Sequence, residues 1–225
     1  MKKNLLLGIV AMAVVMPLSA NAYDLSFSDI NPMFNYSTNT EASNTTPATI
    51  ANSAMNTINQ LNAQIASTDK NVQNSFLTLV SLLSPQKEAQ TMQSKIATIM
   101  GNATTTQNAK SAAVAQLMSA YASAMGTNKT SMLATIAKLS AADKSTLANT
   151  LTSLAQSQYQ YLNIAGDYTK AAGNLAKTSN ITNIANNLVT AKETANTIRT
   201  NALAIKNVVT QAAALANASG INVNL

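Results

Sequence analysis

The last third of the chain repeats its apolar residues every seven positions. Over residues 181–216 they recur at intervals of three and four, with no Gly, Pro or aromatic residue among them. One row holds Ile181, Leu188, Ala195, Ala202, Val209 and Ala216, and the other holds Ile184, Ala191, Ile198, Ile205 and Ala212. A sustained seven-residue spacing predicts a helix that supercoils around a neighbour. Since about half of these residues are Ala, we expect closely spaced helix axes.

A second stretch with the same period lies just before the first. Leu147, Leu154, Tyr161, Tyr168 and Leu175 are seven apart, and Leu151, Gln158, Ala165 and Ala172 lie between them. Only the polar residues 177–180 separate the two stretches, and so short a connection favours antiparallel neighbours. The pattern therefore predicts a hairpin of helices 141–178 and 180–218. With its turn near Ser179, Lys192 falls beside Asp167, and Arg199 falls beside Gln160 and Tyr161.

Helical spacing also runs through residues 47–139. It weakens at Thr68 and Asp69, where polar residues interrupt the apolar stripe between Ile65 and Val72. Cap-like residues divide the stretch: Thr46 with Pro47, Ser84 with Pro85, Gly101, Gly126, and Ser140 with Asp143. We therefore predict an all-α fold, an elongated helical bundle with a long C-terminal antiparallel coiled-coil-like hairpin.

The N-terminus has the pattern of a secretory leader. Lys2 and Lys3 precede an apolar stretch at 5–15, and Pro17 comes before the small-residue pattern Ala20-Asn21-Ala22. We expect residues 1–22 to be a signal peptide that is removed, with a retained anchor as the alternative. The chain would then be exported, to the periplasm or to the outside or surface of a bacterial cell.

Residues 23–46 differ from the rest of the chain because they hold four of its nine aromatic residues, Tyr23, Phe27, Phe34 and Tyr36. We expect an extended N-terminal arm. Exposed aromatic rings usually find a packing partner, so the favoured interpretation packs this arm on the bundle at 47–219. The alternative is that the arm docks into a protein partner.

The C-terminal tail, residues 220–225, alternates Ile221, Val223 and Leu225 with Asn. This alternation is strand-like, and the tail could pair with Leu25 and Phe27, which alternate in the same way. Fraying of the terminus is the favoured interpretation.

Composition narrows the range of partners. Charged residues make up 10% and aromatic residues 4% of the chain, while hydrophobic residues, many of them Ala, make up 47%. The formal charge is +6 with Lys2 and Lys3 included, and +4 without them. Nucleic-acid binders usually cluster Lys and Arg on one face, whereas this chain spreads its cations thinly and has a single Arg. We therefore do not expect a nucleic-acid partner.

The chain lacks the side chains that most often carry chemistry. It has neither His nor Cys, the commonest general base and the best nucleophile. Its eight carboxylates include no pair three or four residues apart, and no Ca²⁺ loop or Gly-rich phosphate loop is present. We therefore predict no cofactor, no metal site and no enzymatic activity. Ser84 and Lys87 match S-x-x-K of the serine β-lactamases, but without a companion K-T-G the favoured interpretation is a helix cap.

One row of cations borders the Ala-rich heptads, because Lys192, Arg199 and Lys206 are seven residues apart. The favoured interpretation is a solvated flank that meets acceptors on the neighbouring helix. The alternative is a contact with an anionic polysaccharide, lipid headgroups or an acidic protein.

These observations favour a structural or interaction protein that self-associates, joins a surface assembly or presents a helical face to a partner. The alternative is a membrane-active protein that resembles the α-helical pore-forming toxins in outline, since both pair long helices. The candidate membrane segment is FLTLVSLL, residues 76–83. It is too short to span about 30 Å of hydrocarbon, so membrane contact would be interfacial.

Overall fold

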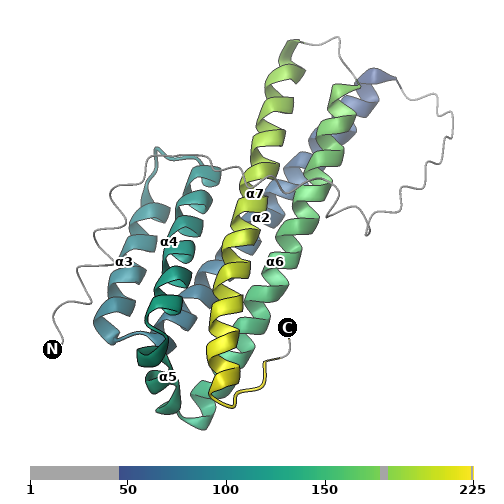
Figure 1. The fold of residues 1–225 in the computed structure, drawn as a ribbon. Helices are drawn as coiled ribbons and strands as arrows, with labels where there is room; N and C mark the ends of the chain where they lie inside the picture. Colours follow the sequence, from purple (N-terminus) through teal and green to yellow (C-terminus); the bar gives the residue numbers. More distant parts are fainter. Residues whose placement is uncertain (1–45, 178–181, 224) are drawn as a thin grey trace. The chain divides into compact units, whose positions relative to one another are not determined.

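The computed structural model describes residues 46–177, 182–223 and 225, and these residues form helices without a β-strand. The six helices are α2 (Pro47–Leu83), α3 (Gln86–Gly101), α4 (Gln107–Thr127), α5 (Lys129–Ala137), α6 (Ala141–Ala176) and α7 (Thr182–Ala218) (Figure 1). The all-α prediction is confirmed. Contacts divide the chain into Met1–Thr46 and Pro47–Leu225, and all six helices belong to the second unit.

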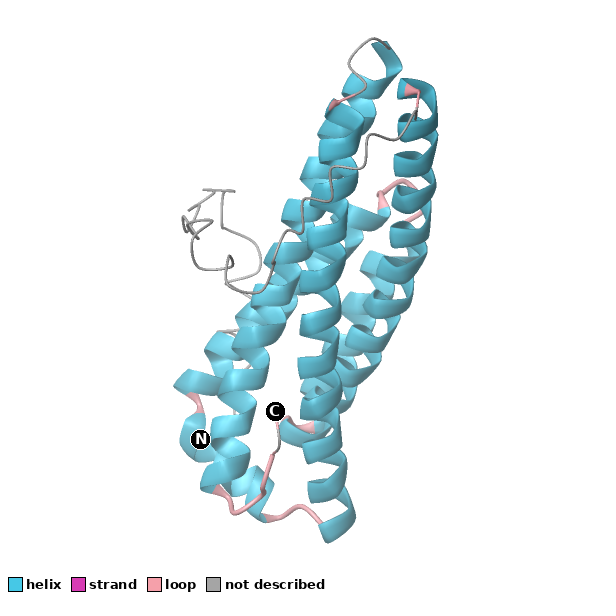
Figure 2. Cartoon of the chain, turned by 90° about the vertical axis from the view of Figure 1, so that its right-hand side faces the viewer, coloured by secondary structure: helices cyan, strands magenta, loops and turns pink. Residues whose placement is uncertain are grey.

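Helix α6 packs against both α2 and α7, while α4 packs mainly on α7. The hydrogen bonds Asp69–Tyr161 and Asn62–Tyr168 show that α2 and α6 are antiparallel, because the residue number falls on one helix as it rises on the other. Bonds from α4 to α7 step in the same direction on both helices, so these two are parallel. Three long helices, α2, α6 and α7, therefore give this unit its long axis (Figure 2).

The predicted hairpin is confirmed as α6 and α7, which lie side by side with opposite directions (Figure 1). With 36 and 37 residues, each helix is about 55 Å long at 1.5 Å per residue. The predicted heptad residues of α7 that the structure describes are buried, except for half-buried Leu188: Ala191, Ala195, Ile198, Ala202, Ile205, Val209, Ala212 and Ala216.

Helix α7 buries one more row than the heptads predicted. Thr194, Asn201, Val208 and Leu215 are all at most 4% exposed. Thr194 and Asn201 bond to α4, which shows that this row faces α4. A helix with two neighbours needs a wider buried stripe than a two-helix coil does, and the heptad spacing did not indicate the second neighbour.

The predicted pairing across the hairpin is wrong in detail. Asp167 pairs with Lys170 of its own helix at 3.1 Å, and the Arg199 guanidinium donates to Thr169 Oγ1 at 3.0 Å. Tyr161 bonds to α2 instead. Helical side chains slope toward the N-terminus of their own helix, and the N-terminus of α7 lies beside the C-terminal end of α6. Arg199 therefore reaches Thr169, beyond Tyr161.

Several predicted caps differ from the structure. Ser140 caps α6 as expected and accepts from the Asp143 N–H. At α3, however, Pro85 holds the N-cap position, and the buried Ser84 hydroxyl bonds to Tyr121 at 2.9 Å. Gly101 is the last residue of α3 rather than its cap. Helix α4 continues past Gly126 to Thr127, because Gly weakens a helix interior without ending it.

The start of the C-terminal tail is fixed rather than frayed. The Ile221 N–H donates to the Ala216 carbonyl and the Gly220 N–H to the Asn217 carbonyl, both at 3.0 Å, which is the Schellman pattern. Gly220 supplies the positive φ of 75° that this turn needs. Ile221 then packs in the core at 8% exposure, an arrangement that satisfies helix-end carbonyls while burying apolar surface. The alternative partners Leu25 and Phe27 lie outside the described residues.

We predict that Ile198→Asp destabilises the bundle far more than Thr200→Asp. Ile198 is 1% exposed in the seam, where an unpaired carboxylate costs about 4 kcal/mol or more. Thr200 lies exposed on the same helix, so its substitution should change the unfolding free energy by less than about 0.5 kcal/mol. Urea titrations followed by circular dichroism compare the two variants, and equal midpoints would contradict the heptad register.

Candidate functional site

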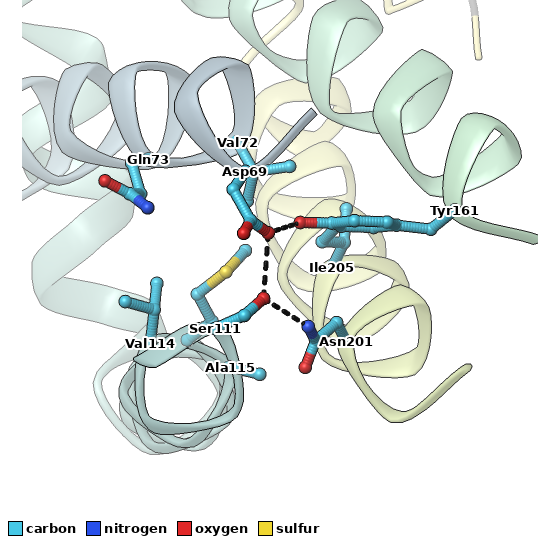
Figure 3. A pocket seen from close by; sticks show the side chains of 10 residues that line it. Asp69, Val72, Gln73, Ser111, Val114, Ala115, Tyr161, Asn201 and Ile205 are labelled. Atoms are coloured by element: carbon cyan, nitrogen blue, oxygen red, sulfur yellow. Dashed lines mark hydrogen bonds between the residues drawn. The ribbon is translucent and has the colours of Figure 1, made fainter. Parts of the chain in front are cut away.

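A layer of polar side chains crosses the interior where four helices meet (Figure 3). Asp69 comes from α2, Ser111 from α4, Tyr161 from α6 and Asn201 from α7, and each is at most 6% exposed. We call these four residues the Asp69 layer. Among the described residues, no other hydrogen-bonded cluster joins all four of these helices.

Three donors hold the Asp69 carboxylate. Tyr161 Oη and Ser111 Oγ donate to Oδ1, the second at 2.8 Å. Gln107 Nε2 donates to Oδ2 at 2.7 Å. Gln107 is also the first residue of α4, so the carboxylate lies beside the positive end of that helix dipole. Neutral donors and the dipole together stabilise a buried anion in place of a cationic side chain.

The hydrogen bonds of the layer have a fixed direction. An ionised carboxylate only accepts, so Ser111 gives its proton to Asp69 and its oxygen is left to accept. Asn201 Nδ2 supplies the donor at 2.5 Å. This sets the orientation of the Asn201 amide, because a flipped amide would bring its oxygen against Ser111. The Asn201 Oδ1 atom is consequently buried, with no hydrogen-bond partner among the described residues.

The buried tyrosines keep their protons. Burial raises the pKa of Tyr161, and the negative charge of Asp69 and the bond to it raise that pKa further. Burial also raises the pKa of Tyr121 to about 12, against a lowering effect of the Ser84 hydrogen bond. Tyr168, which donates to Asn62, has its pKa raised to about 12 by burial. All three phenols therefore stay protonated at neutral pH and do not act as bases, and Tyr161 and Tyr168 act as hydrogen-bond donors.

The Asp69 layer can set the alignment of helices. Its donors and acceptors come from four helices, and sliding one helix along its axis would leave a buried polar group unpaired at a cost of about 1–3 kcal/mol. Buried polar groups fix register in some helical assemblies, and we interpret the layer in this way.

In the described parts of the chain, no group of three or more His, Cys, Asp or Glu side chains could hold a metal ion.

The predicted site residues do not converge on this layer. Lys192 and Lys206 are exposed on α7, and Arg199 is half-buried, bonded to Thr169 and Asn196. The Arg199 bond to Thr169 is a contact with an acceptor on α6, and within the described residues no bond to α6 is seen for Lys192 or Lys206. The aromatic residues of the arm, Tyr23, Phe27, Phe34 and Tyr36, lie outside the described residues.

The structure also describes the two other candidate motifs, S-x-x-K at Ser84 and Lys87 and the apolar segment at residues 76–83. Ser84 bonds to Tyr121 while Lys87 is exposed, and no bond joins Ser84 to Lys87. In the candidate membrane segment, Phe76, Leu79, Val80 and Leu83 are at most 1% exposed and belong to the core. The Phe76 ring meets Tyr121 edge-on, with centroids 5.5 Å apart. No helix within the described residues has the length and apolarity needed to cross a membrane.

A wider hollow lies between α2 and α6, with a volume of about 240 Å³. Half of its lining residues carry hydroxyl or amide groups, including Ser53, Gln60 and Asn174, and the exposed pair Asp167–Lys170 lies at the same place. The lining offers hydrogen bonds but no buried charge.

Asp69 is the one member of the layer that interrupts the apolar pattern of the sequence. Asp69 and Thr68 interrupt the apolar stripe of α2, yet both are buried, at 3% and 4% exposure. A polar residue in a stripe indicates a buried polar contact. The partners could not be found in this way, because each comes from a helix at least 38 residues away along the sequence.

No family model, no curated protein and no solved structure matches this chain. The polar residues that the structure describes lie either in the interior, as in the Asp69 layer, or toward the outer surface of the bundle.

We predict that Asp69→Asn lowers the unfolding free energy by about 2–4 kcal/mol. The substitution removes the charge that three donors converge on and turns an amide toward some of them, leaving buried polar groups unpaired. Urea denaturation measures the change.

Asp167→Asn is the matched control for this measurement. Asp167 makes an exposed ion pair with Lys170, and such pairs contribute less than about 1 kcal/mol. If both variants lose the same stability, the Asp69 layer does not have the importance assigned to it.

We also predict that stability falls at high pH. Unfolded tyrosines ionise near pH 10, whereas Tyr121 and Tyr168 hold their protons to about pH 12 in the fold. The unfolded state therefore binds fewer protons above pH 10. Each tyrosine's contribution is complete below that pH and is lost as the pH rises to about 12, at up to about 1.4 kcal/mol per pH unit. Urea midpoints between pH 8 and 12 test this, and a flat profile would contradict it.

Proposed function

We propose that this chain is an exported, non-enzymatic helical protein that acts by binding protein, either a second copy of itself or another partner. The proposed contact surface is the outer face of the α6–α7 hairpin. The observation that carries this proposal is the distribution of exposed apolar side chains.

Large exposed hydrophobic residues are concentrated on the hairpin. Tyr159 and Leu162 of α6 are 62% and 38% exposed, and Val189 and Leu203 of α7 are 55% and 39% exposed. Within the described residues, Leu225 is the only other large hydrophobic side chain of this kind, and α2, α3, α4 and α5 have none. Single exposed hydrophobic residues are common, but their restriction to one pair of helices is typical of an interaction surface.

Two of these residues lie in the same part of the hairpin. Leu162 is seven residues before Thr169 and so shares its face of α6. Arg199 donates to Thr169 across the boundary with α7, and Leu203 is one helical turn after Arg199. Because the helices are antiparallel, Leu162 and Leu203 lie on the same side of that hydrogen bond. They therefore form the apolar part of the proposed surface.

The cation row gives this surface a positive charge. Lys192, Arg199 and Lys206 run along the same boundary, so an acidic or amide-rich partner would be favoured over a basic one. Charge contributes mostly to the rate and specificity of such contacts, while the buried apolar residues contribute affinity. An anionic polysaccharide or lipid headgroup could contact the row without the apolar residues.

The leader pattern of residues 1–22 supports export. Fractionation of the producing cells and N-terminal sequencing of the exported chain test this part of the proposal, which expects Tyr23 as the first residue. The membrane-active alternative stays a prediction, and leakage of dye from anionic liposomes tests it. That alternative would require Phe76 and its buried neighbours to leave the core.

We predict that Leu162→Ser together with Leu203→Ser weakens association without unfolding the bundle. Both side chains are partly exposed, so little stability should be lost, whereas an interface loses about 1–2 kcal/mol per truncated apolar contact. Sedimentation velocity over a concentration series measures self-association. Crosslinking in the exported compartment measures contact with another partner.

The control for this experiment carries Ala63→Ser and Ala97→Ser, on the exposed faces of α2 and α3. It should associate like the unchanged chain. Equal association and crosslinking by all three proteins would exclude the hairpin face as the contact surface.

A further inference from the structure

Asn201, whose Oδ1 atom is buried without a hydrogen-bond partner among the described residues, lines a small cavity. The cavity has a volume of about 10 Å³, and Asp69, Ser111, Ala115, Tyr161 and Asn201 are among the residues that line it (Figure 3). A space of about 10–15 Å³ is the minimum that holds one water molecule. Asn201 is 4% exposed, so bulk solvent does not satisfy its Oδ1 atom.

Most of the polar groups that the Asp69 layer leaves over at this cavity are acceptors. Tyr161 and Ser111 have given their hydroxyl protons to Asp69, and an Asn201 N–H has gone to Ser111. What remains of the layer is the unpaired Asn201 Oδ1, one Asn201 N–H, and the spare lone pairs of the carboxylate and the hydroxyls. Gln73 also lines the cavity, and its Nε2 atom donates to Met100 Sδ at 3.4 Å. A small occupant that donates hydrogen bonds, or a small cation, complements these acceptors.

Charge favours the neutral occupant. The Asp69 carboxylate already accepts three hydrogen bonds and lies beside the N-terminal end of α4. A cation is therefore not needed to balance it. A monovalent ion in this cavity would also have to shed most of its hydration shell for a few protein oxygens, at a large desolvation cost.

We infer that the cavity in the Asp69 layer is a binding site for one ordered water molecule, which donates to Asn201 Oδ1 and to a second oxygen of the layer. The water supplies the hydrogen-bond donor that Asn201 Oδ1 lacks within the layer. It is part of the fold, and its site is separate from the outer hairpin surface proposed to bind protein.

Ala115 provides the test, because it lines the cavity one turn after Ser111 and lies beside the Asn201 amide in the close view (Figure 3). Ala115→Ser places a hydroxyl donor in the cavity and should displace the water. Oxygen-17 relaxation dispersion on the full chain should then show one long-lived internal water fewer than in the unchanged protein. Ala122→Ser, at another buried Ala of α4, is the control and should keep the full number.

Stability gives a second measurement. Ala115→Val fills the space without a donor, so it should lose the same water and melt at a lower temperature than Ala115→Ser. Equal numbers of long-lived waters in the unchanged chain and in Ala115→Ser would overturn the inference. The inference would also be overturned if NaCl, but not choline chloride, raised the melting temperature of the unchanged chain and had no such effect on Ala115→Ser. That result would assign the cavity to a cation.

Discussion

Asp69 puts a carboxylate into the interior of the bundle, and the surrounding helices must supply donors to keep it there. Tyr161 from α6 and Ser111 with Gln107 from α4 do so, and Asn201 from α7 holds Ser111 in place. Hydrophobic contacts tolerate small axial shifts, whereas hydrogen bonds at 2.5–2.8 Å do not. The alignment of the long helices therefore depends on this layer more than on any single apolar contact.

The apolar seam and the polar layer have different roles. Ala191, Ala195 and Ala202 allow α7 to approach its neighbours closely, and the many small contacts along the seam provide most of the cohesion. Small residues, however, discriminate poorly between alternative registers. The polar layer adds that discrimination at one level of the bundle, where Gln107 and Ser111 from the first two turns of α4 position that helix.

The rigidity of the interior also bears on the function proposed for the outer face. The buried tyrosines keep their protons and the buried carboxylate accepts three hydrogen bonds, so the interior is held rigidly. A rigid hairpin holds Leu162, Leu203 and the cation row at fixed spacing, and a preorganised surface loses less entropy when a partner binds. The proposed contact function and the buried layer are linked in this way.

The sequence alone determined the helices, because spacing and caps are local properties of the chain. The seven-residue rows predicted the α6–α7 hairpin and the burial of residues such as Ile198 and Ala212. Tertiary structure decided what depends on distant neighbours. Thr194 and Asn201 are buried because α7 has a second neighbour in α4, and Arg199 meets Thr169 because of the slope of its side chain. Asp69 was visible as an interruption in a stripe, but its partners are brought together only by the packing of four helices, which no local pattern specifies.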